Sequence, residues 1–584
     1  MINMEQKTNN SLSIVRRRGA ALLVVLFIVM AITILSLGFL SRSDVELACG
    51  RNMVLRTQMD YLADSGLEHA RGLILNPQDV DAEYWKGAEA QQLVAGSAEY
   101  YDLDIVRDDS DRCNYTIDCT AYWMEESERI GRSELRAQLR LDPCIALWTG
   151  NDTTLWDGIS VNGDVYCNGT LVNGGAIDGD AFANALSGSG ISGQLKPIAD
   201  LSLDWPRVTV ADFTTYYATQ NIGTGTISGQ TFGPYSPVRV CYRNGNLVIA
   251  GNVRIEGMLV VDGDLVVQGN ANTITAAKKL PALLVTGDLV VSSSGDLDVD
   301  GLAVINGGVQ VSAGDGNIQV LGGLFVQGEL VETTADSSGN GNAGTLYGGS
   351  IWQPGTGRIG GALRFDNADG TNDYVQIENE SLFDITGQIT VAAWIRVNEF
   401  NRSFQPIFTK GDSAWRIQRF SNTNNIEFAC TGLSHSVPYG SLTGSISVND
   451  GLWHHVAGVY DGSQVYLYVD GNLDISMPSS GNISTNNYKV LIGANAQQSD
   501  RCWNGWIDDV RIYNRGLDVN DVDIVRAGGT TVSGLIGHWR LDESGSDVDI
   551  ITAPEKTAIL VGAVGDEEKW GQAAGAFFRS IKRR

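Results

Sequence analysis

An uncharged segment near the start of the chain constrains the fold and location of this protein more than any other feature. It covers residues 20–40 and directly follows three arginines, Arg16 to Arg18, and Gly19. As a helix the segment is about 31 Å long, which is enough to cross the hydrocarbon core of a bilayer. Because the basic residues precede it, the positive-inside rule predicts a cytoplasmic N-terminus and an exported remainder of the chain.

This segment differs from an ordinary cleaved signal peptide. It is longer than a typical apolar signal region, and no small-x-small cleavage site follows it. Residues 41–73 continue as a polar stretch without proline, which is compatible with a helix. We therefore expect one membrane helix that continues outward as an exposed helix. A plain uncleaved signal anchor is the alternative that the residues leave open.

The N-terminal residues resemble those of type IV minor pilins and of the K-type pseudopilins of type II secretion. The basic leader ends at Gly19. Major pilins carry a glutamate at the fifth position after this point, where this chain has Val24, and the K-type proteins also lack that glutamate. Residues 61–70 look like the stalk of the same proteins. The resemblance implies that a prepilin peptidase removes a leader of residues 1–19 by cutting between Gly19 and Ala20.

Three segments after the stalk alternate apolar and polar residues, as half-buried strands do. They cover residues 98–107, 113–123 and 133–141. With the pilin resemblance they imply a transmembrane and stalk helix over 20–75 and a small α+β pilin-like head over 76–147. An unrelated small α+β domain is equally compatible with these residues.

The composition excludes some classes of partner. Lys and Arg number 41 against 68 Asp and Glu, a net charge of −27, and the charge is spread along the chain. An acidic balance argues against a nucleic-acid partner, which needs a basic face. None of the eight cysteines is spaced as C-x-x-C, which argues against a zinc site.

Disulfides are expected if the chain lies in an oxidising compartment. One candidate pair is Cys113 with Cys119, which would bridge a short hairpin, and another is Cys430 with Cys502. Other pairings stay open, because cysteine spacing does not determine connectivity.

Glycine recurs at a fixed short spacing in the middle of the chain, where the pattern predicts a parallel β-helix over residues 148–330. Short apolar strands alternate with glycines, and the spacing resembles that of bactofilin-type β-helices. Prolines interrupt the pattern at about 183–240, so we expect that stretch to loop out. The clearest run of six-residue spacing is Gly245, Gly251, Gly257, Gly263 and Gly269.

Some hexapeptide β-helices are acyltransferases with a histidine base. The five histidines of this chain all lie outside the glycine-rich segment. We therefore expect this part to act as a scaffold or spacer.

Residues 331–528 carry six motifs in the order found in the LamG-like, concanavalin-type jellyroll family, which they closely resemble. Alternating apolar residues in 389–397 and 465–471, with Asp-Gly turns at 461–462 and 470–471, fit the same reading. The resemblance implies a two-sheet antiparallel sandwich. The motifs are DSSGNGNAGT (336–345), GGALRFD (360–366), ITVAAWIRV (389–397), WHHVAGVYDG (453–462), VYLYVDG (465–471) and WIDDVRIY (506–513).

The opening strand of that family is missing before Asp336 and stands instead at 534–543. Residues 570–578 also echo 357–365. The tail, 529–584, is therefore either a second, truncated jellyroll or a strand that completes the first sandwich, in its own chain or in a neighbour's. Completion within the same chain is the favoured interpretation.

The sequence argues against an enzyme. Jellyroll glycosidases need two close carboxylates, and the Glu-x-Asp-x-x-Glu strand motif is absent. Asp508 and Asp509 are adjacent, so a regular strand would point them to opposite faces, and the same holds for His454 and His455. A polysaccharide hydrolase is the rival prediction from the enzyme class.

Ligand residues follow only from the jellyroll resemblance. Many LamG-like jellyrolls bind calcium, and Asp366, Asp373 and Asp508 are the candidate Ca²⁺ ligands here, with solvated turn aspartates as the alternative. Trp415 or Trp503 would stack on sugars if exposed, although tryptophan in a jellyroll is more often part of the core.

Taken together, these features predict a mainly β, multidomain protein that is anchored in the inner membrane by one N-terminal helix. The bulk of the chain would be periplasmic or on the cell surface. It would present the LamG-like module to a glycan or protein ligand and assemble with pilus or pseudopilus subunits. An anchored adhesin that stands alone, outside any filament, is the rival from the binding-module class.

Overall fold

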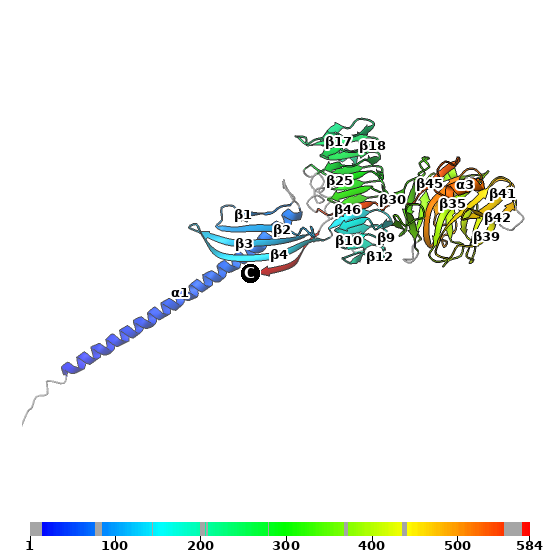
Figure 1. Ribbon diagram of the computed structural model, residues 1–584. Helices are drawn as coiled ribbons and strands as arrows, with labels where there is room; N and C mark the ends of the chain where they lie inside the picture. Colours follow the sequence, from blue (N-terminus) through cyan, green and yellow to red (C-terminus); the bar gives the residue numbers. More distant parts are fainter. Residues whose placement is uncertain are drawn as a thin grey trace, which may run out of the picture.

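The computed structural model describes residues 14–75, 84–142, 144–198, 205, 208–277, 280–366, 372–434, 441–553 and 575–583. It has four parts, which Figure 1 shows one after another from the tip of the long helix to the far end of the molecule. They are the helix α1, a small five-stranded head, a solenoid of parallel strands and an antiparallel sandwich.

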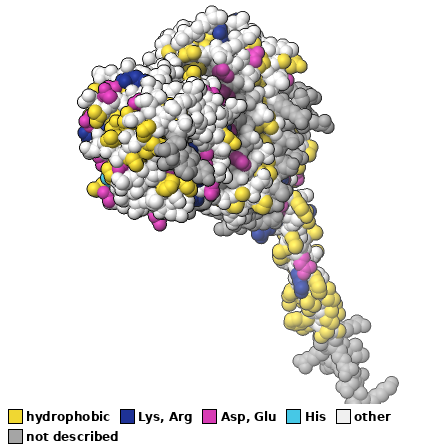
Figure 2. All heavy atoms as spheres, turned by 90° about the vertical axis from the view of Figure 1, so that its right-hand side faces the viewer, with side chains coloured by type: hydrophobic (Ala, Val, Ile, Leu, Met, Phe, Trp, Pro, Cys, Tyr) yellow, Lys and Arg dark blue, Asp and Glu magenta, His cyan; other side chains and the backbone are white. Residues whose placement is uncertain are grey.

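The helix α1 (Ile14–Leu75) has two halves of different character. Every large apolar side chain from Leu22 to Leu40 is more than half exposed, and Figure 2 shows such side chains on the protruding helix. Among the described residues this is the one helix that is long and apolar enough to cross a membrane. Further on, the side chains spaced three or four apart from Met59 to Ile74 are buried against the head sheet.

The head is a five-stranded antiparallel sheet that covers the second half of α1. Three of its strands occupy the alternating segments identified from the sequence. Its edge strand comes from the end of the chain, because β47 pairs with β4 from Leu135 to Asp142. The strands, in sheet order, are β1 (Gly87–Gln91), β2 (Glu99–Arg107), β3 (Asn114–Glu125), β4 (Glu128–Asp142) and β47 (Gly575–Arg583).

The solenoid consists of coils that contribute one strand to each of three faces, and consecutive coils pair in parallel. The first face, sheet I, contains β13 (Leu195–Pro197), β11 (Ala181–Ala183), β8 (Asp164–Cys167), β5 (Ile145–Thr149), β29 (Leu324–Val326), β26 (Ala303–Ile305), β23 (Leu283–Val285), β20 (Met258–Asp262), β17 (Arg239–Asn244) and β14 (Ala218–Asn221).

The second face, sheet II, contains β10 (Ala176–Asp178), β7 (Ile159–Asn162), β46 (Asp547–Ile551), β28 (Asn317–Leu321), β25 (Asp296–Asp300), β22 (Asn272–Thr275), β19 (Arg254–Glu256) and β16 (Thr231–Phe232). The third face, sheet III, contains β15 (Thr226–Ile227), β18 (Leu247–Ala250), β21 (Leu265–Gln268), β24 (Leu289–Val291), β27 (Val309–Ser312) and β30 (Leu330–Thr334), with β12 (Ala185–Gly188), β9 (Thr170–Asn173) and β6 (Thr153–Leu155) as a separate group.

Like residues stack from coil to coil and fill the interior. Leu247 lies beside Leu265, which lies beside Leu289 on the next coil. The step from Leu247 to Leu265 is 18 residues, and three strands at the six-residue glycine spacing account for it. At one corner Gly263 has φ +157°, and a Cβ there would lie 2.7 Å from the backbone of Gly245, so only glycine fits.

The expected loop-out at 183–240 is wrong. Strands β11 to β17 continue through most of this stretch, and of the residues that the structure describes there, those between β13 and β14 leave the coils. There the short helix α2 (Val210–Thr214) and its neighbours lie on the outer face of sheet I, where Phe213 is fully buried and Trp205 contacts Trp148. Apolar outer faces on sheet I explain why this segment stays packed on the solenoid.

The sandwich is inserted into a single coil of the solenoid. Each complete coil visits sheets I, III and II in turn, but after β29 and β30 the chain passes into the sandwich. It returns as β46, which takes the vacant place of that coil in sheet II between β28 and β7. The coil is therefore assembled from segments more than 200 residues apart.

Two antiparallel sheets form the sandwich, with the largest apolar cluster of this part of the chain between them. Sheet IV continues sheet III, because β30 pairs antiparallel with β31. It contains β31 (Gly344–Tyr347), β34 (Tyr374–Ile377), β43 (Val490–Ile492), β36 (Pro406–Thr409), β37 (Trp415–Arg419), β38 (Asn425–Cys430) and β39 (Ser441–Ser447). Sheet V contains β32 (Ile351–Gln353), β33 (Ala362–Phe365), β44 (Gly505–Tyr513), β35 (Ile389–Val397), β40 (Trp453–Tyr460), β41 (Gln464–Val469) and β42 (Asn472–Pro478), with β45 (Leu535–Trp539) beside β44.

Short helical segments complete the sandwich. The single-turn helix η2 spans Glu380–Phe383, and the helix α3 (Val519–Arg526) packs on the outer face of sheet V through Val522 and Val525.

The tail contributes one strand to each of the three β parts and does not form a second jellyroll. Strand β45 pairs with β44 in the same chain, β46 belongs to the solenoid and β47 to the head. Of the segment that echoes 357–365, residues 570–574 lie outside the described residues, and residues 575–578 belong to β47. The two segments have a similar composition, and β47 pairs with the open edge of β4.

A buried carboxylate joins the solenoid to the sandwich. Glu332 on β30 is 2% exposed and accepts hydrogen bonds from Trp352 Nε1 (2.8 Å) and from the backbone N (2.6 Å) and Oγ (2.8 Å) of Ser546. Glu332 lies on the strand that leaves the solenoid, Trp352 in the sandwich, and Ser546 on the chain that returns to the solenoid. Burial raises the pKa of Glu332 to about 7, and Asp157 nearby adds to the shift.

Glu332→Gln will remove a pH dependence of stability. In the unfolded chain the carboxyl ionises near pH 4.5, but in the folded protein only near pH 7. Between these values the folded state binds more protons, so the free energy of unfolding falls as pH rises, by up to about 3 kcal/mol. The glutamine loses one hydrogen bond at every pH, because its N–H₂ faces the Trp352 donor.

The measurement is the melting temperature of the full chain in lipid nanodiscs at several pH values from 4.5 to 8. The difference between the native protein and the variant should shrink or reverse as pH rises. A constant difference across this range would contradict a shifted pKa at this position.

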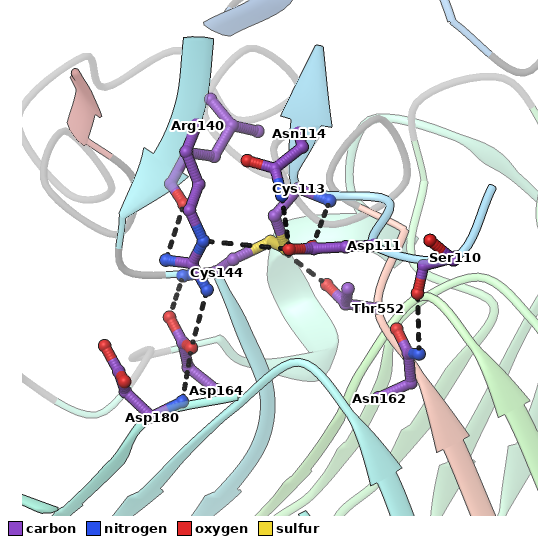
Figure 3. Close-up of a disulfide and its surroundings, with 11 residues drawn as sticks. Ser110, Asp111, Cys113, Asn114, Arg140, Cys144, Asn162, Asp164, Asp180 and Thr552 are labelled. Carbon is purple, nitrogen blue, oxygen red and sulfur yellow. Dashed lines mark hydrogen bonds and ion pairs between the residues drawn. A yellow bond between two sulfur atoms is a disulfide. The ribbon is translucent and has the colours of Figure 1, made fainter. Parts of the chain in front are cut away.

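The head and the solenoid are joined by a disulfide between Cys113 and Cys144, whose Cα atoms are 6.1 Å apart (Figure 3). Beside it, Arg140 of β4 donates to Asp164 of β8 at 3.2 Å. Asp164 is fully buried and also accepts hydrogen bonds from the backbone N of Cys144 (2.6 Å) and of Asp180 (2.9 Å). Covalent and ionic links thus meet at one junction.

Both cysteine pairs suggested by the sequence are wrong. Cys113 precedes β3 and Cys119 lies within it, so six extended residues separate them by about 20 Å, beyond the reach of a disulfide. Cys119 instead packs into the head core beside Gly66. Cys430 lies in β38, whereas Cys502 forms a backbone β-bridge with Ala494, which follows β43. Two strands, β36 and β37, separate β43 from β38 in the sheet.

Candidate functional site

A groove of about 1140 Å³ lies on the outer side of sheet IV of the sandwich. Its floor comes from β37 and β38, and one wall from β39 together with residues 475–477 of β42. The other wall comes from loops that carry Phe404, Asp412 and Arg501. We refer to this hollow as the groove.

The alternation of β37 builds the floor. Trp415 and Ile417 point into the core of the sandwich. Because successive side chains of a strand point to opposite faces, Arg416, Gln418 and the following Phe420 point outward and line the groove. The sequence WRIQRF therefore supplies one face to the core and the other face to the groove.

Glu427 organises the polar side chains of the floor. It lies on β38 directly opposite Gln418, and its neighbour on β39 is Thr443. Its Oε1 accepts a hydrogen bond from Gln418 Nε2, and its Oε2 accepts one from the Ser441 hydroxyl. Arg416 Nε lies 3.8 Å from the same Oε1. Glu427 is 1% exposed, and these neighbours supply the partners that a buried carboxylate needs.

A second charged group holds the opposite wall. Asp412 accepts hydrogen bonds from Arg501 Nη1 (3.0 Å to each oxygen) and from Asn495 Nδ2 (2.8 Å). The guanidinium of Arg501 also lies 4.7 Å above the ring of Phe404, which packs edge-on against Phe420 with centroids 6.1 Å apart. The wall thus presents two half-buried aromatic rings that a charge network holds in place.

Two buried polar atoms of the floor have no hydrogen-bond partner among the described residues. They are Gln418 Oε1, an acceptor, and Arg416 Nε, a donor. Arg416 uses its Nη1 to donate to the backbone O of Asp412 at 2.7 Å, which leaves Nε without an acceptor in range. A buried polar group without a partner costs about 1–3 kcal/mol, and such groups mark places where a ligand can bind.

The three candidate calcium ligands are not brought together. Asp366 and Asp373 are neighbours, because Asp373 Oδ2 accepts the backbone N of Asp366 at 2.7 Å. Asp508 lies beside the start of β33 and Asp366 beyond its end, about 14 Å along the strand. Among the described residues no group of three His, Cys, Asp or Glu side chains is placed to hold a metal.

The donor set of these aspartates does not suit calcium. Both oxygens of Asp373 accept backbone N–H groups, of Gly349 (2.7 Å) and of Asp366, and the Asp366 carboxylate pairs with Arg364 at 2.8 Å. Asp508 Oδ2 likewise accepts two backbone N–H groups, and burial raises the pKa of this carboxyl to about 7. Calcium needs several ionised or carbonyl oxygens that are free to converge.

Asp508 and Asp509 do not point to opposite faces as a regular strand requires. Ala392 pairs with Arg511 and Trp394 with Asp508, so two residues of β44 face the single residue between them on β35. Asp509 has φ +51° at this bulge. The extra residue places both aspartates on the outer side of sheet V, since Ile507 and Val510 on either side both belong to the core.

The two adjacent histidines do diverge. His454 lies near the surface and makes hydrogen bonds of 2.8 Å with Asp470 and 3.0 Å with Asp450. Burial lowers its pKa, but these two carboxylates outweigh that effect and raise it overall. His455 is fully buried against Trp394, and burial lowers its pKa to about 4.

Trp415 and Trp503 are both fully buried, so neither is placed to stack on a sugar. Gly19 and Ala20 lie within α1, and the structure leaves cleavage of this bond as a prediction.

The groove itself was not identified from the sequence. Its signal was the alternation of WRIQRF, in which Arg, Gln and Phe share one face, and the acidic Glu427 on the next strand.

Comparison with known proteins gives one family match. Residues 369–523 match the sequence model of the concanavalin A-like lectin/glucanases superfamily. No protein with a curated description matches the chain.

Several solved structures are similar to part of this chain. A candidate carbohydrate-binding protein of Bacteroides ovatus is 16% identical, with 38% of this chain and 59% of that chain covered and a TM-score of 0.27. The binding domain of Paraclostridial Mosquitocidal Protein 1 is 19% identical, with 34% and 51% covered and a TM-score of 0.27. This chain thus spans less than two thirds of either protein.

Domain 4 of AbnA, an extracellular arabinanase of Geobacillus stearothermophilus solved with arabinotriose, is 20% identical, with 34% and 98% covered and a TM-score of 0.25. With the two-sheet topology described above, the family match supports the expected concanavalin-type jellyroll for residues 369–523.

Proposed function

We propose that the protein is a membrane-anchored binding protein that presents its sandwich to a glycan outside the membrane. The observation that carries the proposal is the groove, where hydrogen-bonding side chains on the floor lie beside the half-buried rings of Phe404 and Phe420. Glycan sites need this combination of polar groups and apolar faces. The lectin/glucanase family match and the apolar N-terminal helix support it.

Binding without hydrolysis is the activity that these charges favour. The groove holds two carboxylates, Asp412 and Glu427, and Arg416 Nε lies 3.8 Å from an oxygen of each. A glycosidase needs a pair of carboxyl groups that are free to reach the glycosidic bond, but both oxygens of Asp412 bind Arg501, and those of Glu427 bind Gln418 and Ser441. We therefore propose that the groove retains a polysaccharide and leaves it intact.

The finer parts of the proposal concern the anchor. We propose that α1 crosses the inner membrane with its N-terminus in the cytoplasm and that prepilin peptidase cuts between Gly19 and Ala20. In that case the stalk and head would join a pilus or pseudopilus. N-terminal sequencing of the mature protein from the native membrane should then begin at Ala20. An intact leader would favour an adhesin that stands alone in the membrane.

The glycan proposal is tested with the full chain in lipid nanodiscs, without sugar-headed detergent, on a glycan array. We expect binding that EDTA does not change and that Phe420→Ala weakens about fivefold to tenfold, because the ring supplies an apolar face. The matched control is Leu452→Ala, since Leu452 is an apolar side chain of the sandwich that is 64% exposed and lies outside the groove. Binding to no glycan, or equal loss in both variants, would contradict the proposal.

A further inference from the structure

We propose that the groove selects an uncharged polysaccharide and grips it through a pair of neighbouring hydroxyls, one on Gln418 Oε1 and one on Arg416 Nε. This inference rests on the proposed function, because it assigns the class of glycan to the same groove. It follows from the balance of charges in the groove, from the orientation of one amide and from the two atoms that lack a partner.

The charges of the groove neutralise one another. Its lining contains two arginines, Arg416 and Arg501, and two carboxylates, Asp412 and Glu427. Arg501 binds both oxygens of Asp412, and Arg416 lies between Asp412 and Glu427. A uronate or sulfated sugar would need a cation in excess, since burying an unpaired charge is costly. The net charge of −27 on the whole chain adds a long-range repulsion against anionic polymers.

The neighbours of Gln418 determine which end of its amide meets the ligand. Glu427 Oε1 is an acceptor only, so the Gln418 amide must direct its Nε2 toward it. The carbonyl Oε1 is then turned away from Glu427, and it has no partner among the described residues. A reversed amide would bring two oxygens together. The floor therefore offers a fixed acceptor.

The matching donor lies close by. Arg416 is two residues before Gln418 on the same face of β37, and its Nε is 3.8 Å from the oxygen that Gln418 Nε2 contacts. The free acceptor and the free donor thus flank one carboxylate oxygen. A hydroxyl group both donates and accepts, so adjacent hydroxyls of a sugar ring can satisfy the two atoms at once.

The aromatic wall fits the same class of ligand. The rings of Phe404 and Phe420 are both half-buried and stand beside the polar floor. An uncharged pyranose or furanose presents C–H groups on its faces and hydroxyls around its edge. The floor would take the hydroxyl edge, and the rings would cover the apolar face.

The test compares oligosaccharides of two charge classes on the full chain in nanodiscs by calorimetry: mannohexaose, xylohexaose and cellohexaose against trigalacturonic acid. We expect at least one neutral oligomer to bind, with an affinity that changes less than twofold between 50 and 500 mM NaCl. Trigalacturonic acid should bind at least tenfold more weakly.

Two variants examine the hydroxyl pair. Arg416→Lys keeps the charge but removes the Nε donor, and Gln418→Leu removes the acceptor at nearly constant volume. Each should weaken binding of the neutral oligomer about tenfold, the effect of losing one buried hydrogen bond. Melting curves check that both variants fold, and Arg416→Lys retains the ion pairs if Gln418→Leu does not fold. The matched control is Gln319→Leu, an exposed glutamine of the solenoid, which should bind like the native protein.

The outcomes separate this inference from the proposed function. Preferential binding of trigalacturonic acid, or a neutral oligomer that binds Arg416→Lys as tightly as the native protein, would overturn the inference and leave a glycan-binding groove in place. Failure of every oligosaccharide and of the array to bind would overturn both.

Discussion

Trp539→Ala will lower the free energy of unfolding of the sandwich by about 3–5 kcal/mol, which is the usual cost of removing a large aromatic side chain from a core. Trp539 ends β45 and is fully buried between the two sheets. Its ring lies 5.5 Å from that of Phe408 and 6.1 Å from that of Phe383, and its Nε1 donates to the backbone O of Asn342 at 2.8 Å.

The measurement is chemical unfolding of the full chain followed by tryptophan fluorescence. Arg540→Ala is the matched control, because Arg540 is the next residue, is exposed and pairs only with Asp542 near the surface. We expect it to change stability by no more than about 0.5 kcal/mol. If Trp539→Ala unfolded like the native protein, β45 would not belong to the sandwich core. The interpretation of the tail as a second, truncated jellyroll would then be favoured.

Cys113→Ser will lower stability by about 3–4 kcal/mol and will loosen the head from the solenoid. The disulfide closes a loop with a sequence separation of 31, and a loop of that length restricts the unfolded chain by this amount. Cys144→Ser should have the same effect, and the double variant no more than either alone, since one bond is lost in each case.

Melting of the native protein and the variants with and without dithiothreitol measures this effect. The native protein and the control Cys49→Ser should become less stable when the reductant is added, whereas Cys113→Ser and Cys144→Ser should not. Cys49→Ser serves as the control, because Cys49 is an exposed cysteine of α1 outside the disulfide. A variant of Cys119 that reproduced the loss in full would restore the hairpin pairing suggested by cysteine spacing.

Local patterns were sufficient to predict the elements of this protein. The uncharged segment 20–40 predicted the exposed first half of α1, and glycine spacing indicated short strands that stack as coils, of 18 residues from Leu247 to Leu265 and longer in the coils that follow. Alternation in 389–397 predicted β35, whose residues are nearly all buried because α3 and its neighbours cover the outer face. These signals succeed because they depend on neighbours within a few positions.

Pairings between distant segments were not predictable in this way. Strand β46 has only five residues, and nothing in Asp547–Ile551 indicates that its partners are β28 and β7. The bulge at Asp509 shifts the face of each following side chain, and a strict alternation rule cannot anticipate the extra residue. The same holds for Cys144, which meets Cys113 only because β4 leads directly into the solenoid.

The candidate site illustrates the same limit. The sequence interpretation sought sugar-binding residues among tryptophans and calcium ligands among aspartates. The groove instead relies on Arg416, Gln418 and Glu427, residues whose roles arise from their register on adjacent strands. Register depends on the partner strand, which single-strand patterns do not specify.

The insertion of the sandwich into one coil has a mechanical consequence. A pull on the sandwich would pass to the solenoid through two crossings, β30 and β46, rather than through a single connection. Strand β46 pairs over five positions with β28 and over four with β7, so a pull along it must shear many hydrogen bonds together. Proteolytic cleavage of either crossing would still leave the sandwich attached to the solenoid by the other.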